Sequence, residues 1–325
     1  MKRKLIFLLL LEAIAIGGTA LCAVLVGDRN KEKEGYVCVT SFYPIRLLAE
    51  SVAEGVPDVL VVNLTQNHSG CIHDYTLTTK DMKLLSEADL FLINGGGMEV
   101  FLTKAAKTNK NLPIVDTSAG YAYLQGVEHH HGGEDHGEEH DGNSKAHNHA
   151  GNDNAHVWMD VDGYLLQLSR VEEAFVKMDP EHGQTYRSNA QKCREKLLAL
   201  KEKYATAAAL TKDFPAIAFH EGFVYTFRML NMETLHCLSM DAETQISAGE
   251  AAEIVTECRL HDKTVLFADA DYLDNVEKTF SEETGAKVWV LDPITGGKSD
   301  RFGADAYIQA MEHNLSVILE ATGNQ

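Results

Sequence analysis

The sequence predicts an α/β protein with two lobes, each built on a mostly parallel sheet and joined by one long, rigid helix. Short β-rich runs alternate with helical segments in both halves of the chain, and a long helical stretch separates the halves. This alternation is typical of βα units. The chain has 325 residues, of which 45% are hydrophobic. It is therefore long enough for two domains, since a domain usually has roughly 100–200 residues.

In the first half, strands and helices follow one another at the spacing of βα units. Each predicted strand is a short run rich in Val, Ile, Leu, Phe or Tyr, bounded by turn residues. The strands are predicted at residues 36–40, 59–62, 89–93 and 113–116, and the helices between them at residues 45–52, 79–88 and 98–107.

The segment that follows His156 changes to long helices. Apolar residues recur there at three- and four-residue steps, which predicts one amphipathic face. These residues are Leu165, Leu168, Val171, Phe175 and Met178. Asp179 is expected to be the N-cap of the next helix and Pro180 its first residue. That helix is predicted over residues 181–209, and it spans on the order of 40 Å.

The alternation of strands and helices then returns. Strands are predicted at residues 216–219, 264–268 and 287–291, and helices at residues 249–259, 273–284 and 304–321. We therefore expect an N-terminal α/β lobe over residues 36–180, a linking helix over residues 181–210 and a C-terminal α/β lobe over residues 211–325.

The N-terminus has the pattern of an export segment. A basic start at Lys2, Arg3 and Lys4 precedes a nearly continuous apolar run over residues 5–26. Residues 1–27 are therefore predicted to be a signal peptide or membrane anchor, and the charged residues 28–35 a tether. Cleavage after Ala20, lipidation at Cys22 and retention as an anchor all remain open, and all three place the folded chain outside the cytoplasm, at the cell surface or in a periplasm.

A histidine-rich loop is predicted over residues 126–153. It consists almost entirely of His, Gly, Asp, Glu and Asn, so it cannot bury enough surface to fold by itself. Imidazole suits Zn²⁺ and neighbouring metals, which predicts auxiliary, low-affinity metal binding in this loop. The histidines are His129, His130, His131, His136, His140, His147 and His149.

Charge and cysteine content limit the partners and the covalent links. The net charge of −19 argues against nucleic acid and suits a protein that attracts cations. Apart from Cys22, five cysteines remain, without a C-x-x-C pair. A disulfide between Cys237 and Cys258 is one interpretation, and buried free thiols are the alternative.

Four candidate metal ligands come from both halves of the chain. Ligands bind parallel sheets beyond the carboxyl ends of the strands. His73 follows the second predicted strand, His220 ends the strand at 216–219, and Asp292 ends the strand at 287–291; His156 stands just before Trp158. Three imidazoles and one carboxylate complete a zinc tetrahedron, with Zn–N distances of ~2.0–2.1 Å. A metal site in the cleft between the lobes is therefore predicted, although each residue alone also fits a surface position or a turn.

The chain resembles the metal-specific solute-binding proteins of ABC importers, which are the zinc and manganese uptake receptors. The resemblance covers essentially everything from Tyr36 to the C-terminus, in order. The matching stretches are residues 40–44, 70–75, 88–99, 156–160, 179–189, 219–225 and 283–293. The histidine-rich loop lies where zinc-type members of that family carry theirs.

This resemblance implies that His73, His156, His220 and Asp292 are the ligands of a transported ion. Manganese-type members have Glu at the position of His220, and an imidazole there favours Zn²⁺, although Mn²⁺ and Cd²⁺ stay open. The resemblance also implies a monomer that is tethered or secreted and that delivers Zn²⁺ to an ABC permease. Two departures are Thr76, where the family has an acidic residue, and residues 266–270, where the family's Phe-x-Glu-Pro is changed.

Three other functions fit the residues less well. An extracytoplasmic metalloenzyme of the H-E-x-x-H type needs His at position 224, which is Val224. Nucleotide binding at residues 296–299 lacks the first glycine of a P-loop. A zinc buffer or sensor, with the histidine-rich loop as the main site, remains the third alternative. The chemistry predicted here is coordination, not catalysis.

Overall fold

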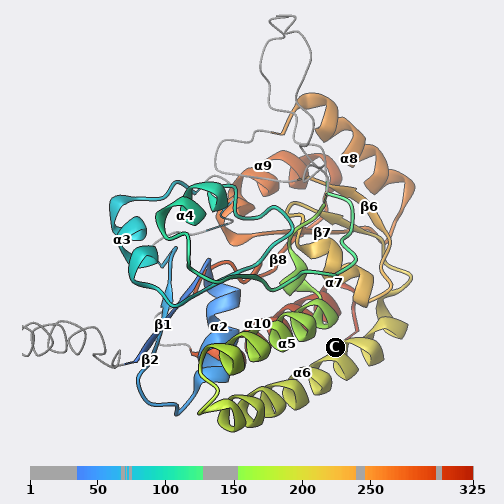
Figure 1. Ribbon diagram of the computed structural model, residues 1–325. Helices are drawn as coiled ribbons and strands as arrows, with labels where there is room; N and C mark the ends of the chain where they lie inside the picture. The colour runs from blue at the N-terminus through green and yellow to red at the C-terminus, as the bar shows by residue number, and fades with distance from the viewer. Residues whose placement is uncertain are drawn as a thin grey trace, which may run out of the picture.

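Two four-stranded parallel sheets form the framework of the protein (Figure 1). The computed structural model describes residues 35–66, 70, 72, 75–126, 153–238, 246–297 and 302–324. One sheet has the strand order β2-β1-β3-β4 and the other β6-β5-β7-β8, and every pairing is parallel. The predicted α/β class with mostly parallel sheets is therefore confirmed.

The N-terminal sheet follows the predicted order of elements. These are β1 (Tyr36–Thr40), α2 (Tyr43–Ala53), β2 (Val59–Asn63), α3 (Thr79–Glu87), β3 (Leu90–Ile93), α4 (Leu102–Thr108) and β4 (Ile114–Asp116). The prediction that a helix starts at Met98 was wrong. The backbone after β3 makes a turn with positive φ at Gly95, Gly96 and Gly97, and the Glu99 carboxylate accepts hydrogen bonds from the backbone N–H of Asn94 and Gly95.

The C-terminal sheet contains two elements that the sequence analysis missed. Its elements are β5 (Ala216–Ala218), α7 (Phe223–Met229), β6 (Thr234–Cys237), α8 (Ala248–Leu260), β7 (Val265–Ala268), α9 (Leu273–Thr284) and β8 (Val288–Val290). The missed elements are α7 and β6. Both are too short to show a hydrophobic period, and β6 is only partly buried along its length.

Long helices connect and support the two sheets. They are α5 (Val161–Met178), α6 (Gly183–Thr211) and the C-terminal α10 (Gly303–Ala321); short 3₁₀ turns, η1 (Val157–Met159) and η2 (Ala270–Tyr272), complete the chain. Figure 1 shows α10 returning to lie against α2 and α6 in the lower part of the view. Within the described part of the chain, no helix is both long and apolar enough to cross a membrane.

The start of α6 differs from the prediction. Asp179 is not the N-cap of α6 but the C-cap of α5, and His182 is the N-cap of α6. The Asp179 carboxylate instead accepts a hydrogen bond from the Tyr186 hydroxyl at 2.8 Å and contacts His182 Nδ1 at 2.7 Å. The pattern Asp-Pro predicted a cap, but side chains from the start of α6 hold this carboxylate at the junction between the two helices.

One buried apolar cluster continues from the N-terminal sheet through α5 and α6 to the C-terminal sheet, where it includes Phe267. Stacking of Tyr164 on Tyr307, with ring centroids 3.7 Å apart, joins α5 to α10 at its centre. A second, smaller cluster lies under the C-terminal sheet alone. Because the main core is shared, the connection between the sheets is broader than one helix. The lobe boundaries at residues 36–180 and 211–325 stay a prediction.

The cysteine alternatives are resolved for the residues that the structure describes. Cys38, Cys193, Cys237 and Cys258 are free thiols, so the disulfide between Cys237 and Cys258 was wrong. Burial raises the pKa of Cys237 well above its usual value. Such a thiol behaves as a small apolar side chain. The N-terminal segment and the histidine-rich loop, apart from residues 126 and 153, lie outside the described residues.

Candidate metal centre

The segment that carries His156 connects the carboxyl ends of strands from the two sheets. On one side, Asn94 at the end of β3 donates a hydrogen bond from Nδ2 to the carbonyl of Ala155 at 2.8 Å. On the other side, Asn154 donates from Nδ2 to the carbonyl of Glu221, just beyond β5, at 2.9 Å. His156 is therefore held where the strand ends of both sheets come together, as expected for a ligand site in parallel sheets.

His156 and His220 lie against each other at this place. Their ring centroids are 4.9 Å apart in an edge-to-face arrangement, and the two residues are only 2% and 5% exposed. His220 comes two residues after β5, whereas His156 immediately precedes η1. The structure thus brings together two of the four predicted ligands from segments far apart in the sequence.

Each of these rings has a defined hydrogen bond at Nδ1. Nδ1 of His156 lies 2.9 Å from Asn154 Oδ1 and 3.8 Å from Glu221 Oε2. Nδ1 of His220 accepts a hydrogen bond from the backbone N–H of Gly222 at 3.0 Å. Hydrogen bonds of this kind decide which ring nitrogen carries the proton.

Asp292 lies two residues beyond β8 on a tightly held loop. The side chain of Asn314, fully buried in α10, accepts from the Asp292 N–H and donates to the Asp292 carbonyl, both at 2.8 Å. The carboxylate accepts from the N–H of Ile294 at 2.7 Å. Next to it, Trp158 donates from Nε1 to the Pro293 carbonyl at 2.8 Å. Trp158 therefore connects the His156 segment to the loop of Asp292.

Asp269 is a second carboxylate at this edge of the C-terminal sheet, and the sequence analysis did not include it among the site residues. It directly follows β7, which lies between β5 and β8 in the sheet. Burial, together with the negative charges of Asp271 and Asp292, raises its pKa to about 6, although backbone N–H donors oppose the rise. Its position at a strand end is the signal that could have identified it.

The complete set of four ligands stays a prediction. His73 lies outside the described residues, as do the histidines from His129 to His149. Among the residues that the structure describes, no group of three or more His, Cys, Asp or Glu side chains is arranged to hold a metal ion. Thr76, at the position where an acidic residue was expected, supplies no carboxylate.

Two parallel α/β halves with converging strand ends are the architecture that the resemblance to the class of solute-binding proteins predicted. In agreement with this class, the fold is similar to that of the solute-binding protein FpvC of Pseudomonas aeruginosa, solved in a complex with Ni²⁺. The TM-score is 0.71 with 18% sequence identity, over 89% of this chain and 97% of that one. At this level of identity the similarity shows the fold alone.

The sequence comparisons identify the family. The family described as zinc-uptake complex component A, periplasmic, matches residues 38–321, and the chain belongs to this family. The high-affinity zinc uptake system protein ZnuA of Bacillus subtilis is 27% identical over 301 residues, which are 91% of this chain and 90% of that protein. The zinc-binding lipoprotein AdcA of Streptococcus pneumoniae serotype 4 is 25% identical over 321 residues, which are 97% of this chain but 62% of that protein. The chain thus spans less than two thirds of this longer relative.

Proposed function

We propose that this protein is an extracytoplasmic receptor that binds Zn²⁺ between its two lobes and delivers it to an ABC permease. The observation that carries the proposal is the buried contact between His156 and His220, with ring centroids 4.9 Å apart. Two imidazoles this close, at the strand ends of a solute-binding fold, suit a transition-metal ion better than an organic solute. The names of the relatives, which refer to zinc uptake and zinc binding, support the same ion.

In this proposal the ion is held by His73, His156, His220 and Asp292. Three neutral imidazoles and one carboxylate fill the four positions that Zn²⁺ prefers, so no position stays open for the water that a catalytic zinc requires. The protein therefore binds and releases its ion without catalysing a reaction. Imidazole in place of a second carboxylate also favours Zn²⁺ over Mn²⁺, which prefers harder oxygen ligands.

The proposal also gives the location of the protein in the cell and the membrane protein with which it interacts. The N-terminal residues 1–27 export the chain and either leave it secreted or tether it to the membrane. A monomeric receptor then presents its ion to the transmembrane subunits of the permease. The periplasmic description of the family supports a place outside the cytoplasm.

A zinc buffer or sensor is the second candidate. The composition of the loop from His129 to His149 favours it, because seven imidazoles among carboxylates bind Zn²⁺ without a folded site. In that case the loop holds the ion with the higher affinity, and the contact between His156 and His220 serves only packing.

Zinc titration of the full chain and of four variants tests the two candidates. Affinity is measured by competition with a fluorescent zinc chelator, for the full chain, for a deletion of residues 129–149, and for His156→Ala and His220→Ala. We expect the deletion to keep one high-affinity Zn²⁺ and the two substitutions to lose it. His313→Ala, which removes an exposed imidazole on α10, is the matched control and keeps wild-type affinity.

The opposite pattern supports the buffer or sensor. If the deletion loses all high-affinity Zn²⁺ while His156→Ala and His220→Ala retain it, the receptor site between the lobes is wrong. A parallel titration with Mn²⁺ tests the ion, and stronger binding of Mn²⁺ than of Zn²⁺ would contradict the assignment.

A further inference from the structure

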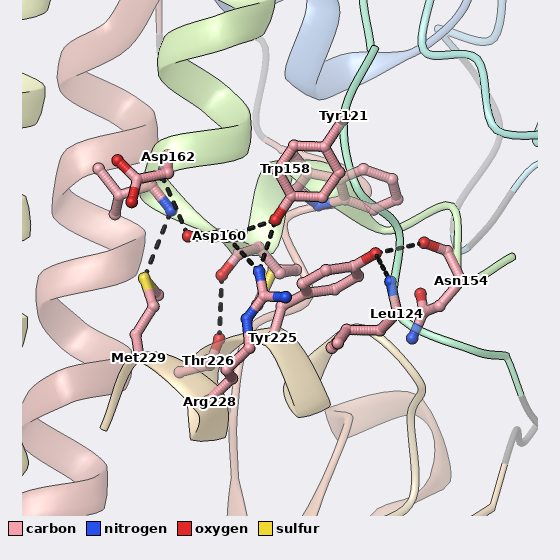
Figure 2. A network of polar contacts seen from close by, with 12 residues as sticks. Tyr121, Leu124, Asn154, Trp158, Asp160, Asp162, Tyr225, Thr226, Arg228 and Met229 are labelled. Carbon is pink, nitrogen blue, oxygen red and sulfur yellow. Dashed lines mark hydrogen bonds and ion pairs between the residues drawn. The ribbon is translucent and has the colours of Figure 1, made fainter. Parts of the chain in front are cut away.

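Asn154 is a buried amide whose polar groups all point to partners in other parts of the site. It is 1% exposed. Its backbone N–H donates to the Leu124 carbonyl at 2.8 Å, and its carbonyl accepts from the Tyr225 hydroxyl at 2.7 Å. Figure 2 shows Tyr225 between Leu124 and Asn154, with its hydroxyl accepting from the Leu124 N–H at 3.0 Å. Two hydrogen bonds thus hold the backbone of Asn154 in place independently of its side chain.

The side-chain amide of Asn154 can have only one orientation. Its Nδ2 faces the Glu221 carbonyl at 2.9 Å, and its Oδ1 faces the backbone N–H of His156 at 3.1 Å. Exchanging the two atoms would set donor against donor at His156 and acceptor against acceptor at Glu221. Because a buried polar group without a partner costs about 1–3 kcal/mol, the observed orientation is strongly favoured.

This orientation determines the proton on the imidazole of His156. Oδ1 of an amide is only an acceptor, so the ring nitrogen that lies 2.9 Å from it must donate. The neutral ring therefore carries its proton on Nδ1 and its lone pair on Nε2. His220 is the opposite case: its Nδ1 accepts from the Gly222 N–H, so in the metal-free protein its neutral ring carries the proton on Nε2. Coordination of an ion by His220 therefore requires the contact with Gly222 to break, so that one ring nitrogen presents its lone pair.

We infer that Asn154 is a positioning residue for metal binding, which holds His156 with Nε2 as the coordinating nitrogen and ties it to the His220–Glu221 turn. The inference rests on the proposed metal site and extends it to a residue that does not touch the ion. Partners of this kind that hold a ligating histidine change metal affinity by about 10–100-fold when they are removed. The tie to Glu221 adds a second effect, since it fixes the distance between the two imidazoles.

The first test is the position of the proton in the metal-free protein. Full-length chain is labelled with ¹⁵N-histidine and treated with a chelator, and long-range ¹H–¹⁵N correlation spectra report which nitrogen of each ring is protonated. The signals of His156 and His220 are identified by their loss in the corresponding alanine variants. We expect the proton on Nδ1 in His156 and on Nε2 in His220. A proton on Nε2 of wild-type His156 overturns the inference without any variant at Asn154.

Two substitutions then separate the functions of the amide. Asn154→Ala removes all three side-chain hydrogen bonds, so we expect His156 to lose its preference for the Nδ1 proton and Zn²⁺ affinity to fall by about 10–100-fold. Asn154→Asp keeps an acceptor for Nδ1 but no donor for the Glu221 carbonyl. It should therefore keep the Nδ1 proton and bind Zn²⁺ more tightly than Asn154→Ala does.

Asn189→Ala is the matched control. Asn189 is also a buried amide, and it donates to the carbonyls of Val52 and Glu54, far from the site. An equal loss of Zn²⁺ affinity in Asn154→Ala and Asn189→Ala would indicate general destabilisation and overturn the inference, as would unchanged affinity in Asn154→Ala. If instead His156→Ala keeps full affinity while the proton positions are as expected, the positioning role still falls and the error lies in the ligand assignment of the proposed function.

Discussion

Asp160 is the residue at which the connection between the two halves can be tested most directly. One carboxylate oxygen accepts from the backbone N–H of Asp162 at 3.1 Å and caps α5. The other accepts from the Tyr121 hydroxyl, which comes from the loop after β4, and from Arg228 at the end of α7 (Figure 2). A single side chain, 7% exposed, therefore joins segments of both sheets and the helix between them.

Three contributions set the cost of Asp160→Ala. Loss of an N-cap costs about 1 kcal/mol. Loss of the hydrogen bond between Tyr121 and a carboxylate costs about 1.5–3 kcal/mol. The ion pair with Arg228 contributes at most about 1 kcal/mol, because the arginine side chain is 41% exposed. We expect the free energy of unfolding to fall by about 4 kcal/mol. Asp160→Asn should lose about half of this, because Asn caps helices as well as Asp does.

Urea unfolding followed by circular dichroism measures these differences. Arg228→Met should lose less than about 1 kcal/mol. Lys201→Met, which removes an exposed ion pair to Asp162, is the control and should change little. If Asp160→Asn is as unstable as Asp160→Ala, the cap and the neutral acceptor contribute nothing. If Arg228→Met alone accounts for the whole loss, the assignment of most of the energy to buried contacts is refuted.

Two further predictions concern buried polar groups. Burial raises the pKa of Glu99 from 4.5 to about 7, so the folded state holds this proton more tightly than the unfolded state. Stability should therefore fall, by up to about 3 kcal/mol, as the pH rises from 4.5 to 7, and the difference from Glu99→Gln in urea unfolding should change over this interval; a constant difference would contradict the argument. Trp158→Phe leaves the Pro293 carbonyl without its donor and opens space beside Phe42. It should lower the free energy of unfolding by about 2–4 kcal/mol, and a loss below 1 kcal/mol would show that the loop after Asp292 rearranges easily.

Much of the fold could be predicted because buried parallel strands leave a clear sequence pattern. A strand such as Leu90–Ile93 is covered on both faces, so it is a continuous apolar run between turn residues. Helices such as α9 matched their predicted limits because one face is apolar over three turns. The element α7 and the strand β6 were missed because seven and four residues are too few for a period to be recognised.

The errors come from residues whose contacts in the fold differ from those that the sequence pattern suggests. Asp179 before a proline is a common helix start, yet two side chains of the following segment hold its carboxylate elsewhere. A disulfide between Cys237 and Cys258 was compatible with the sequence, because a sequence does not give the distance between two cysteines, which decides whether they can be linked. In both cases the sequence pattern is a common one, and the contacts in the folded protein differ from those that the pattern predicted.

For the site, strand ends could be predicted but the residues that hold the ligands could not. His156 and His220 were expected together because the carboxyl ends of parallel strands meet at one edge, and the structure brings their rings into contact. The residues beside these histidines are held mostly by backbone groups. Asn154 donates a hydrogen bond to the Glu221 carbonyl, and Trp158 donates one to the Pro293 carbonyl. Every residue has a carbonyl, so such a partner has no signature in the sequence. Candidate ligands at strand ends can therefore be predicted from a sequence, whereas the tautomer and orientation of each imidazole become visible only in the fold.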